Sequence, residues 1–289
     1  MSERDRHNGV DHSCVRFRFA DDKLTKASDH LAVEEPLEII LDYPQQATRV
    51  RLTLAVTMRT PTVDDNQGDE ELATGFLFAE GLIKNKSDIT SLARDYEAPR
   101  PENTIIVSLA HAPAGDPDQL HRHFFTNSAC GVCGKTSMQA LELLHQPALT
   151  PDAPHIAAST LCTLPSRLRE QQQQFASTGG VHACALFSTQ GELLMLREDI
   201  GRHNAFDKLI GACVMQQQLD LLKQSIILVS GRASFELVQK ALMADVPLLA
   251  AIGAPSTLAH QLAQRHNLTL VGFLKADSFN IYHSPERVK

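Results

Sequence analysis

The sequence lacks an excess of basic residues and lacks any long apolar run. Its 27 Lys and Arg stand against 34 Asp and Glu, which gives a formal net charge of -7. Because phosphate binding depends on clustered Lys and Arg, this balance argues against a nucleic-acid partner, and an anionic ligand would need a local pocket. No stretch approaches the roughly 20 apolar residues of a membrane span, and the charged N-terminus has no secretory apolar core. We therefore expect a cytoplasmic protein with no membrane contact.

Cysteine is also scarce, with 6 in the 289 residues. Scattered cysteines in this number are too few to staple a chain of this size, and the cytoplasm would keep most of them as thiols. Only Cys130 and Cys133 lie close together in the sequence. The composition of the whole chain, 43% hydrophobic and 21% charged, is that of a globular protein.

The first part of the chain has the pattern of a β-rich domain, which we place at residues 31–125 after a loosely ordered N-terminus at 1–30. Apolar runs and apolar–polar alternation predict strands at 37–43, 50–60 and 103–110. An acidic stretch at 64–71 precedes an apolar segment and predicts a helix, because acidic side chains suit the positive end of the helix dipole.

The second part of the chain alternates apolar strands with amphipathic helices. We expect residues 126–150, which hold the cysteine pair and a helix from Thr136, to connect the lobes. Residues 151–289 then form an α/β domain whose order of elements predicts a mostly parallel sheet with helices on its faces. The expected fold class is therefore α/β in this domain and α+β for the whole chain.

Three predicted strand ends in this domain carry residues suited to an anion. In parallel sheets, ligands collect beyond the carboxyl ends of the strands, where helices begin with free N–H groups and partial positive charge. Arg232, Ser256 and Lys275 each lie at the end of one apolar run. If these strands are parallel, the three side chains converge on one rim that suits phosphate groups. The alternative is that the Gly- and Ser-containing turns only cap helices.

The segment 198–208 is dense in charged and imidazole side chains. It places Arg202, His203 and Asn204 at a predicted helix start, where an anion would be stabilised, although solvated helix starts are often this polar. Upstream, the glycines at 179–180 allow the backbone to lie close to a ligand, and His182 either lines the same cleft or is an ordinary core residue.

The pair Cys130 and Cys133, in SACGVCGK, admits three interpretations. A structural zinc site needs four ligands and usually a second close pair, which is missing, although nearby histidines allow a mixed site. A thioredoxin-like redox pair would follow a strand and an aromatic residue, which are also missing. A sulfur carrier needs a reactive thiolate on a mobile loop, and Gly131, Gly134 and Lys135 supply flexibility and positive charge. Local chemistry leaves these interpretations open.

Longer motifs follow one another along the chain: SACGVCGK, TGGVHACAL, EDIGRHNAFDKLIG, SGRASFELVQKA, APSTLA, and LVGF with FNIY close behind. In this order they resemble the formate dehydrogenase accessory sulfurtransferase family, FdhD. The resemblance runs from EEPLEI at Glu34 through ELATGFLFAEGLI to the C-terminus. It covers nearly the whole chain, and motifs in series are far more specific than one cysteine pair.

The resemblance implies a sulfurtransferase that takes sulfur from a cysteine desulfurase and delivers it to the molybdenum cofactor, bis(molybdopterin guanine dinucleotide), for formate dehydrogenase. The sulfur would be carried as a persulfide on Cys130, with Cys133 stabilising or resolving it. The resemblance further implies a cytidine-deaminase-like C-terminal domain without zinc chemistry, and a homodimer. The cofactor-binding segment maps onto Phe273, Leu274, Lys275, Ala276, Asp277 and Ser278. Ala276 and Asp277 stand where family members often have glycine and arginine.

The sequence therefore supports a persulfide carrier with no tightly bound metal of its own. The residues expected to hold the acceptor cofactor, besides that segment, are Arg232, Ser256, Arg202, His203 and Asn204. Two other functions stay open. A chaperone for the cofactor or the apo-enzyme would do no chemistry with its cysteines, and a zinc-bound structural module would contain stoichiometric zinc.

Overall fold

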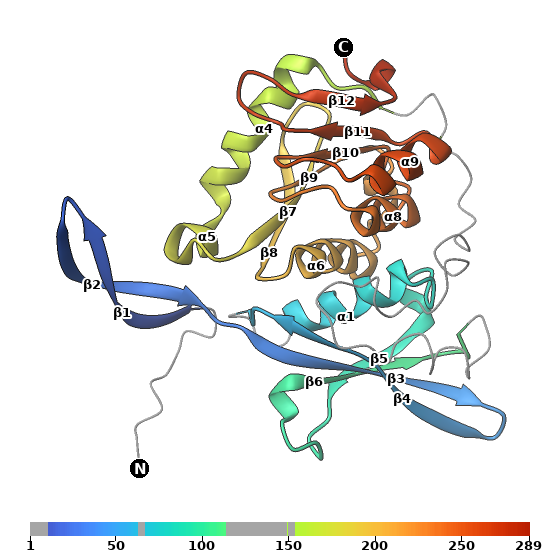
Figure 1. Ribbon diagram of the computed structural model, residues 1–289. Helices are drawn as coiled ribbons and strands as arrows, with labels where there is room; N and C mark the ends of the chain where they lie inside the picture. The colour runs from blue at the N-terminus through green and yellow to red at the C-terminus, as the bar shows by residue number, and fades with distance from the viewer. Residues whose placement is uncertain (1–10, 63–66, 114–148, 150–153) are drawn as a thin grey trace.

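The computed structural model describes residues 11–62, 67–113, 149 and 154–289, which form two lobes and a projecting arm (Figure 1). Three sheets occur in these residues: one of two strands in the arm, one of four in the first lobe and one of six in the second. This agrees with the expected mixture of helix and strand, and with a β-rich first part. The likeness to cytidine deaminases stays a prediction.

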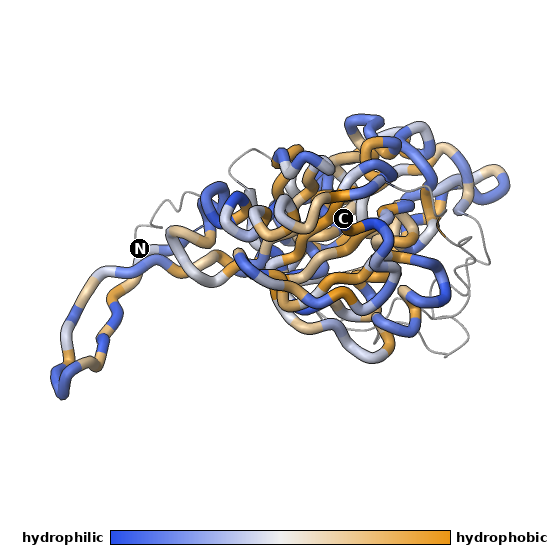
Figure 2. Tube along the Cα trace, turned by 90° about the horizontal axis from the view of Figure 1, so that it is seen from above, coloured by the Kyte–Doolittle hydropathy of each residue, from blue (hydrophilic) through white to orange (hydrophobic). Residues whose placement is uncertain are grey.

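The arm is an antiparallel hairpin of β1 (Asp11–Ala20) and β2 (Lys23–Ala32) that extends away from both lobes (Figures 1 and 2). Its tight turn has positive φ angles of 50° at Asp21 and 56° at Asp22, which aspartate tolerates better than most residues. The expectation of a loosely ordered stretch over residues 1–30 is therefore wrong from Asp11 onward. A two-residue Asp turn between alternating strands was the missed signal.

The first lobe contains a four-stranded sheet and one long helix. Its elements are β3 (Glu35–Gln45), β4 (Thr48–Arg59), α1 (Gln67–Ala79), η1 (Lys86–Asp88), β5 (Ile89–Arg94), η2 (Pro101–Asn103) and β6 (Thr104–Leu109). The spatial order of the strands is β4-β3-β6-β5, with β3 and β6 parallel. The predicted strands at β3, β4 and β6 and the helix at α1 are confirmed, and β5 was not expected.

The second lobe has a six-stranded sheet in the order β12-β11-β10-β9-β7-β8. Its strands are β7 (His182–Phe187), β8 (Leu193–Asp199), β9 (Ile226–Val229), β10 (Leu248–Ala251), β11 (Thr269–Gly272) and β12 (Asn280–His283). Its helical elements are α4 (Ala158–Gln171), α5 (Gln173–Thr178), α6 (Arg202–Met215), α7 (Leu219–Leu222), α8 (Phe235–Met243), α9 (Thr257–His266) and η4 (Pro285–Arg287).

This sheet is mixed, so the prediction of a mostly parallel sheet is wrong. Only β9, β10 and β11 run parallel to one another, whereas β7, β8 and β12 pair antiparallel with their neighbours. The links from β7 to β8 and from β11 to β12 are too short for a crossover, which needs a dozen or more residues. Apolar runs in a sequence do not indicate the direction of a strand. A short link between two neighbouring strands does, because it permits only an antiparallel pair.

The lobes share one hydrophobic core. A single cluster of buried residues includes side chains from β3 and α1 together with side chains from α6, α8, α9 and the sheet of the second lobe. A second cluster lies on the other face of that sheet, under α4. Alternate residues of the buried strands point to the two clusters, as a sheet covered on both faces requires. The predicted domain boundaries therefore do not separate two cores.

Helices α1 and α6 contact each other through two glycines. A Cβ atom on Gly75 would lie 1.9 Å from the backbone oxygen of Asp207, and one on Gly211 would lie 1.8 Å from the backbone oxygen of Glu71. Contacts this short exclude any side chain, so glycine permits the two helix backbones to meet. This contact fixes the position of α6 relative to the first lobe.

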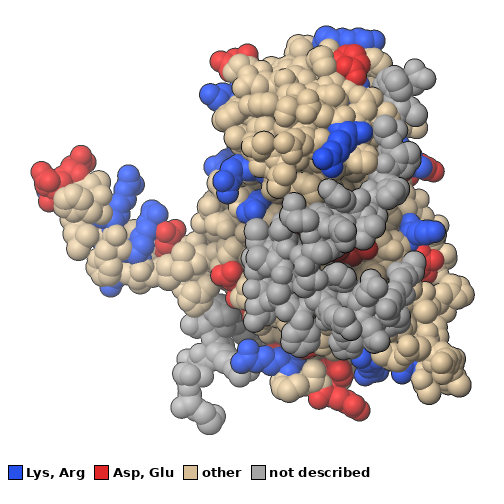
Figure 3. Space-filling view, turned by 45° about the vertical axis from the view of Figure 1, so that its right-hand side comes forward, with Lys and Arg blue, Asp and Glu red and all other residues tan. Residues whose placement is uncertain are grey.

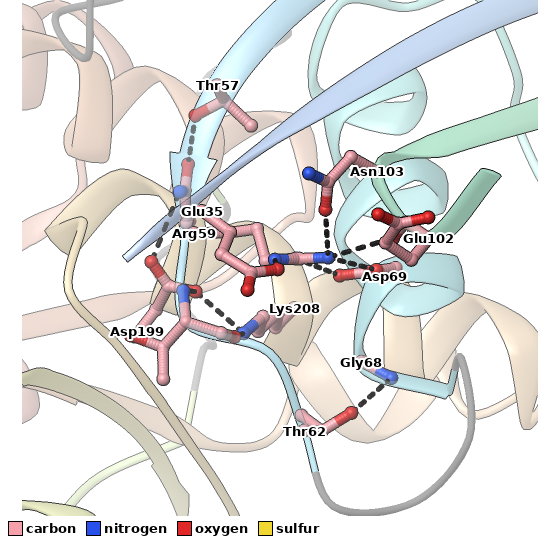
Figure 4. A network of polar contacts seen from close by, with 12 residues as sticks. Glu35, Thr57, Arg59, Thr62, Gly68, Asp69, Glu102, Asn103, Asp199 and Lys208 are labelled. Carbon is pink, nitrogen blue, oxygen red and sulfur yellow. Dashed lines mark hydrogen bonds and ion pairs between the residues drawn. The ribbon is translucent and has the colours of Figure 1, made fainter. Parts of the chain in front are cut away.

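Each lobe has a buried ion pair near the contact between the lobes (Figure 4). In the first lobe, the guanidinium of Arg59, 2% exposed, donates to both carboxylate oxygens of Asp69 at 2.8 and 3.1 Å. In the second lobe, the ammonium of Lys208 lies 2.6 Å from Asp199 Oδ2, and it reaches the first lobe by donating to the Thr60 carbonyl at 2.8 Å. Because an unpaired buried charge is costly, the partners of Lys208 hold the start of α6 in place.

Among the helices in the described residues, none has the length and apolar character that a membrane crossing requires.

Candidate functional site

The loops after β9, β10 and β11 lie side by side along one edge of the second sheet. The Gly253 backbone N–H donates to the Gly231 carbonyl at 2.9 Å, and the Phe273 N–H donates to the Gly253 carbonyl at 3.1 Å. These bonds continue the pairing of the strands beyond their ends and into the loops. We call this edge, formed by residues 230–234, 252–256 and 272–278, the strand-end rim.

Two helices begin at the rim with serine caps. Ser234 is the N-cap of α8, and Ser256 is the N-cap of α9, where its Oγ accepts from the Ala259 N–H at 3.2 Å. Ser256 is nevertheless exposed, and its N–H is bound by the Ala233 carbonyl at 3.0 Å. Both cap oxygens thus satisfy helix N–H groups, while the helix ends add partial positive charge to the rim.

The two predicted rim cations, Arg232 and Lys275, are exposed. Arg232 lies against the neighbouring loop, since a Cβ on Gly253 would be 3.0 Å from Arg232 Cγ. Lys275 lies in the adjacent loop and donates its backbone N–H to the Ser278 carbonyl at 2.8 Å. The structure therefore places Arg232, Ser256 and Lys275 on one edge, with both charged side chains open to solvent.

The predicted cofactor segment after β11 is a loop with mixed exposure. Phe273 has a positive φ of 53°, which is strained for a bulky residue, and its ring is exposed. Leu274 is buried in the core beneath the sheet and cannot contact a ligand at the surface. The other four members, Lys275, Ala276, Asp277 and Ser278, are exposed, and Ser278 Oγ donates to Asp277 Oδ1 at 3.0 Å.

Two residues at the start of α6 are bound within the protein. Asn204 donates to the Met58 carbonyl at 2.6 Å and accepts from Thr57 Oγ1 at 3.1 Å, so it links α6 to β4. His203 Nε2 lies 3.2 Å from Glu236 Oε2, near the start of α8. Both side chains are buried, and their contacts hold elements together. Because neither side chain offers an exposed polar group, the structure does not support the predicted role of His203 and Asn204 in ligand binding.

Arg202 and His182 flank the rim at Gly231. A Cβ on Gly231 would lie 3.4 Å from His182 Nδ1 and 3.9 Å from Arg202 Cδ, so both side chains lie against this turn. Arg202 Nε is buried without a hydrogen-bond partner in the described residues. Ser230 adjoins them and accepts from the Ala183 N–H through its Oγ at 2.9 Å.

A pocket of about 490 Å³ opens beside the rim. It is lined by Pro165, Arg169, Gln172, Phe175, Gly179, Gly180, Val181, His182, Ser230 and Ile252. The guanidinium of Arg169 stacks over the Phe175 ring at 4.0 Å from its centre. The glycine pair was expected near a ligand, and of the two interpretations of His182 the structure shows the one in which it lines the cleft. Arg169 and Phe175 were missed because nothing in the glutamine-rich stretch of sequence marks them.

The charges around His182 disfavour its protonation. Burial, and then the positive charge of Arg202, lower the pKa of His182, and Asp199 opposes this only in part. Asp199 has little negative charge to offer, because its carboxylate already binds Lys208 and accepts from the Gly201 N–H at 2.8 Å. His182 is therefore neutral at neutral pH, next to a permanent cation.

The predicted sulfur site, Cys130 and Cys133, lies outside the described residues. Cys184 is fully buried in the core, and burial raises its pKa well above the ordinary value. Cys213 is buried too, and burial raises its pKa to about 11. Neither thiol is a nucleophile at neutral pH. In the described part of the chain, His, Cys, Asp and Glu form no group of three or more that could hold a metal ion.

Comparison with known proteins places these features in a family. Residues 32–289 match the model of the FdhD/NarQ family. The chain is 45% identical over 287 residues to the sulfur carrier protein FdhD of Mycobacterium tuberculosis, covering 96% of this chain and 98% of that one. It is 37% identical to the sulfur carrier protein FdhD of Sulfolobus acidocaldarius, with 91% and 92% covered.

A solved structure shows the same fold. The crystal structure of a protein from Desulfotalea psychrophila, described as a formate dehydrogenase accessory protein, superimposes with a TM-score of 0.71. The alignment covers 97% of this chain and 100% of that one at 21% sequence identity. From the family match and the near full-length relatives together, this chain belongs to the FdhD/NarQ family.

Proposed function

We propose that this protein is a sulfurtransferase that carries sulfur on Cys130 from a cysteine desulfurase to the molybdenum cofactor of formate dehydrogenase. The observation that carries the proposal is full-length similarity to sulfur carrier proteins, in a chain whose pair Cys130 and Cys133 stands in the motif SACGVCGK. The exposed cations of the strand-end rim support it, because they suit an anionic acceptor.

The loading step is a thiol–persulfide exchange. The Cys130 thiolate attacks the terminal sulfur of the desulfurase persulfide, a new S–S bond forms at Cys130, and the desulfurase cysteine leaves as a thiolate. No oxidant is needed, since the sulfane sulfur moves without a change in its oxidation state. Cys133 then stabilises or resolves the persulfide.

The delivery step breaks the S–S bond on Cys130 and returns the bond's electron pair to the Cys130 sulfur as a thiolate. The sulfur that leaves becomes a sulfide ligand, which takes two electrons. These electrons come from the molybdenum of the acceptor, which therefore enters the step in a reduced state. The cofactor is the substrate of this reaction, and the protein needs no resident metal for it.

The acceptor is bis(molybdopterin guanine dinucleotide), and its pyrophosphates would lie on the strand-end rim. Arg232 and Lys275 supply exposed cations, and the starts of α8 and α9 supply partial positive charge. Phe273 presents an exposed ring on which a guanine can stack. Asp277 disfavours an anion beside it, so we place the phosphates on the Arg232 side of Lys275. We further propose that the working protein is a homodimer in the cytoplasm.

The competing proposal is a chaperone that binds the cofactor or the apo-enzyme without any cysteine chemistry. The rim by itself suits such a chaperone as well as it suits a transferase. The two proposals differ in what they require of Cys130, and a variant lacking this thiol decides between them.

Complementation of cells that lack the endogenous gene provides the test. Cys130→Ala is expected to abolish formate dehydrogenase activity, whereas Cys162→Ala, on α4, is the matched control and is expected to keep it. Mass spectrometry after incubation with a desulfurase and cysteine should find one added sulfur in the wild type and none on Cys130→Ala. If Cys130→Ala activates formate dehydrogenase fully while Arg232→Ala does not, the chaperone is correct and the transferase is wrong. Stoichiometric zinc in the purified protein would support the zinc-bound module instead.

A further inference from the structure

Two polar side chains at the Gly231 turn are not used by the fold itself, and one of them, His182, lines the pocket beside the strand-end rim. The His182 side chain has no hydrogen bond to another described residue, and Arg202 Nε is buried without a partner among the described residues. Elsewhere, buried cations such as Arg59 and Lys208 are paired with carboxylates. A buried guanidinium nitrogen left without a partner is costly, which points to a group that binds there in the working protein.

We propose that His182 and Arg202 form an anion-binding pair that receives the charged terminal sulfur during transfer. The two side chains flank the same point, since a Cβ on Gly231 would touch both at 3.4 Å and 3.9 Å. The inference rests on the proposed function, because that function supplies the sulfur anion, namely the persulfide of Cys130. Arg202 contributes a charge and a free donor, and the imidazole contributes one N–H.

The surroundings of the pair favour an anion. The start of α6 adds partial positive charge, because the Gly201 N-cap leaves its first turn without a side-chain cap. Asp199 on β8 is neutralised by Lys208, and Arg169 on α4 also lines the pocket. The net potential at the pair is therefore positive.

Sulfur fits this pocket better than phosphate does. Much of the lining is apolar or glycine: Pro165, Phe175, Gly179, Gly180, Val181 and Ile252. Phosphate is strongly hydrated and requires many donors when it leaves water, whereas a persulfide anion is large, polarisable and weakly hydrated. His182 lies among these apolar walls and Arg202 beside them, so the pair offers few donors and selects sulfur, while the phosphates of the cofactor remain on the exposed rim.

The pair also has a protonation state suited to this task. Burial and Arg202 keep the pKa of His182 below its ordinary value, so the ring is neutral before an anion arrives. An anion beside the ring stabilises the imidazolium and raises this pKa. When the sulfur leaves, the pKa falls again, and a proton on the ring becomes available to the Cys130 thiolate.

The test is an NMR titration of the histidine side chains in the full-length protein, with the His182 signal assigned through its loss in His182→Gln. The probe is thiocyanate, a sulfur monoanion at every pH used, with chloride at equal ionic strength as the reference. We expect thiocyanate, and not chloride, to raise the pKa of His182. Inorganic phosphate in a parallel titration should have a weaker effect, and an equal effect from phosphate overturns the assignment to sulfur.

Variants at the pair separate charge from packing. Arg202→Gln should raise the pKa of His182 without any anion, since it removes the neighbouring cation, and should weaken thiocyanate binding about tenfold. Arg202→Lys keeps the charge and should keep the low pKa. Arg169→Gln, in the same pocket, is the matched control and should change neither property. If Arg202→Lys behaves as Arg202→Gln does, or if thiocyanate moves no histidine signal, the proposal is wrong.

The outcome is independent of the proposed function. If thiocyanate binds as expected while Cys130→Ala still activates formate dehydrogenase, the anion-binding pair stands and the transferase does not. If Cys130→Ala is inactive and thiocyanate does not bind, the transferase stands and the pair is refuted.

Discussion

The contact between the lobes and the strand-end rim are both rich in charged side chains, but they treat these side chains in opposite ways. Near the contact between the lobes, Arg59 is buried and paired with Asp69 in the first lobe, and Lys208 is buried and paired with Asp199 in the second (Figure 4). At the rim, Arg232 and Lys275 are exposed, and Arg202 Nε beside it lacks a partner among the described residues. Charges that hold a fold together are satisfied within it, and charges left open are available to a ligand.

The largest effect is expected from removing a buried charge between the lobes. Lys208→Met leaves Asp199 unpaired at a position with no solvent exposure, so the free energy of unfolding should fall by about 3–5 kcal/mol. Chemical denaturation measures this loss. A matched control, Lys223→Met, removes an exposed cation on a surface pair and should cost less than about 1 kcal/mol. Equal losses in the two variants would show that the buried pair has no special role.

A slightly smaller loss is expected from closing the gap between α1 and α6. Gly75→Ala would place a methyl group 1.9 Å from the Asp207 backbone oxygen, so the helices must separate, at a cost of about 3 kcal/mol. Gly180→Ala is the control, since its new Cβ would meet Ala32 Cβ at an ordinary 3.5 Å and should cost less than about 1 kcal/mol. A Gly75→Ala protein of wild-type stability would contradict the close helix contact.

A pH-dependent effect is expected at Asp207, which is buried against Lys240 at 2.7 Å. Burial raises the pKa of Asp207 to about 7, although Lys240 opposes the shift. The folded state then retains a proton that the unfolded state loses near pH 4, so this group costs stability as pH rises from about 4 to about 7. Relative to the double variant Asp207→Asn, Lys240→Met, the wild type should lose stability across that window. A constant difference would show that Asp207 stays ionised in the fold.

The smallest effect on stability, and a large one on function, is expected at the rim. Arg232→Gln removes an exposed side chain, so the free energy of unfolding should change by no more than about 0.5 kcal/mol. Binding of the guanine dinucleotide cofactor, measured by calorimetry, should nevertheless weaken by about tenfold, the value of one charge-assisted hydrogen bond. A marked loss of stability would mean that the rim belongs with the structural charges.

How much the sequence revealed depended on the kind of signal. Apolar periodicity located β3, β4, β6, α6, α8 and α9, because each buries one face or stripe in a core. It did not reveal that β7, β8 and β12 run antiparallel, since periodicity has no direction. The hairpin β1–β2 was missed because its side chains are mostly exposed, so that it contributes no buried face, and its alternation around the Asp21–Asp22 turn was overlooked.

Site residues could be predicted where their place at a strand end fixes their position. They could be predicted less well where contacts with distant residues fix it. Arg232, Ser256 and Lys275 were expected on one edge because parallel strands end together. Asn204 hydrogen-bonds to residues of β4 that lie more than 140 positions away in the sequence, and no local sequence pattern indicates such contacts. His182 on β7 and Arg202 on α6 likewise lie near the same turn only because the fold brings these two elements together.

Transfer of labelled sulfur tests the central claim most directly. Radiolabelled cysteine and a desulfurase are supplied to the purified protein, and the label is followed from the Cys130 peptide to the molybdenum cofactor. If Cys130 carries the sulfur, label appears first on Cys130, leaves it as the cofactor gains label, and reaches no cofactor in Cys130→Ala. Label that reaches the cofactor at the same rate with Cys130→Ala would show that Cys130 is not the carrier.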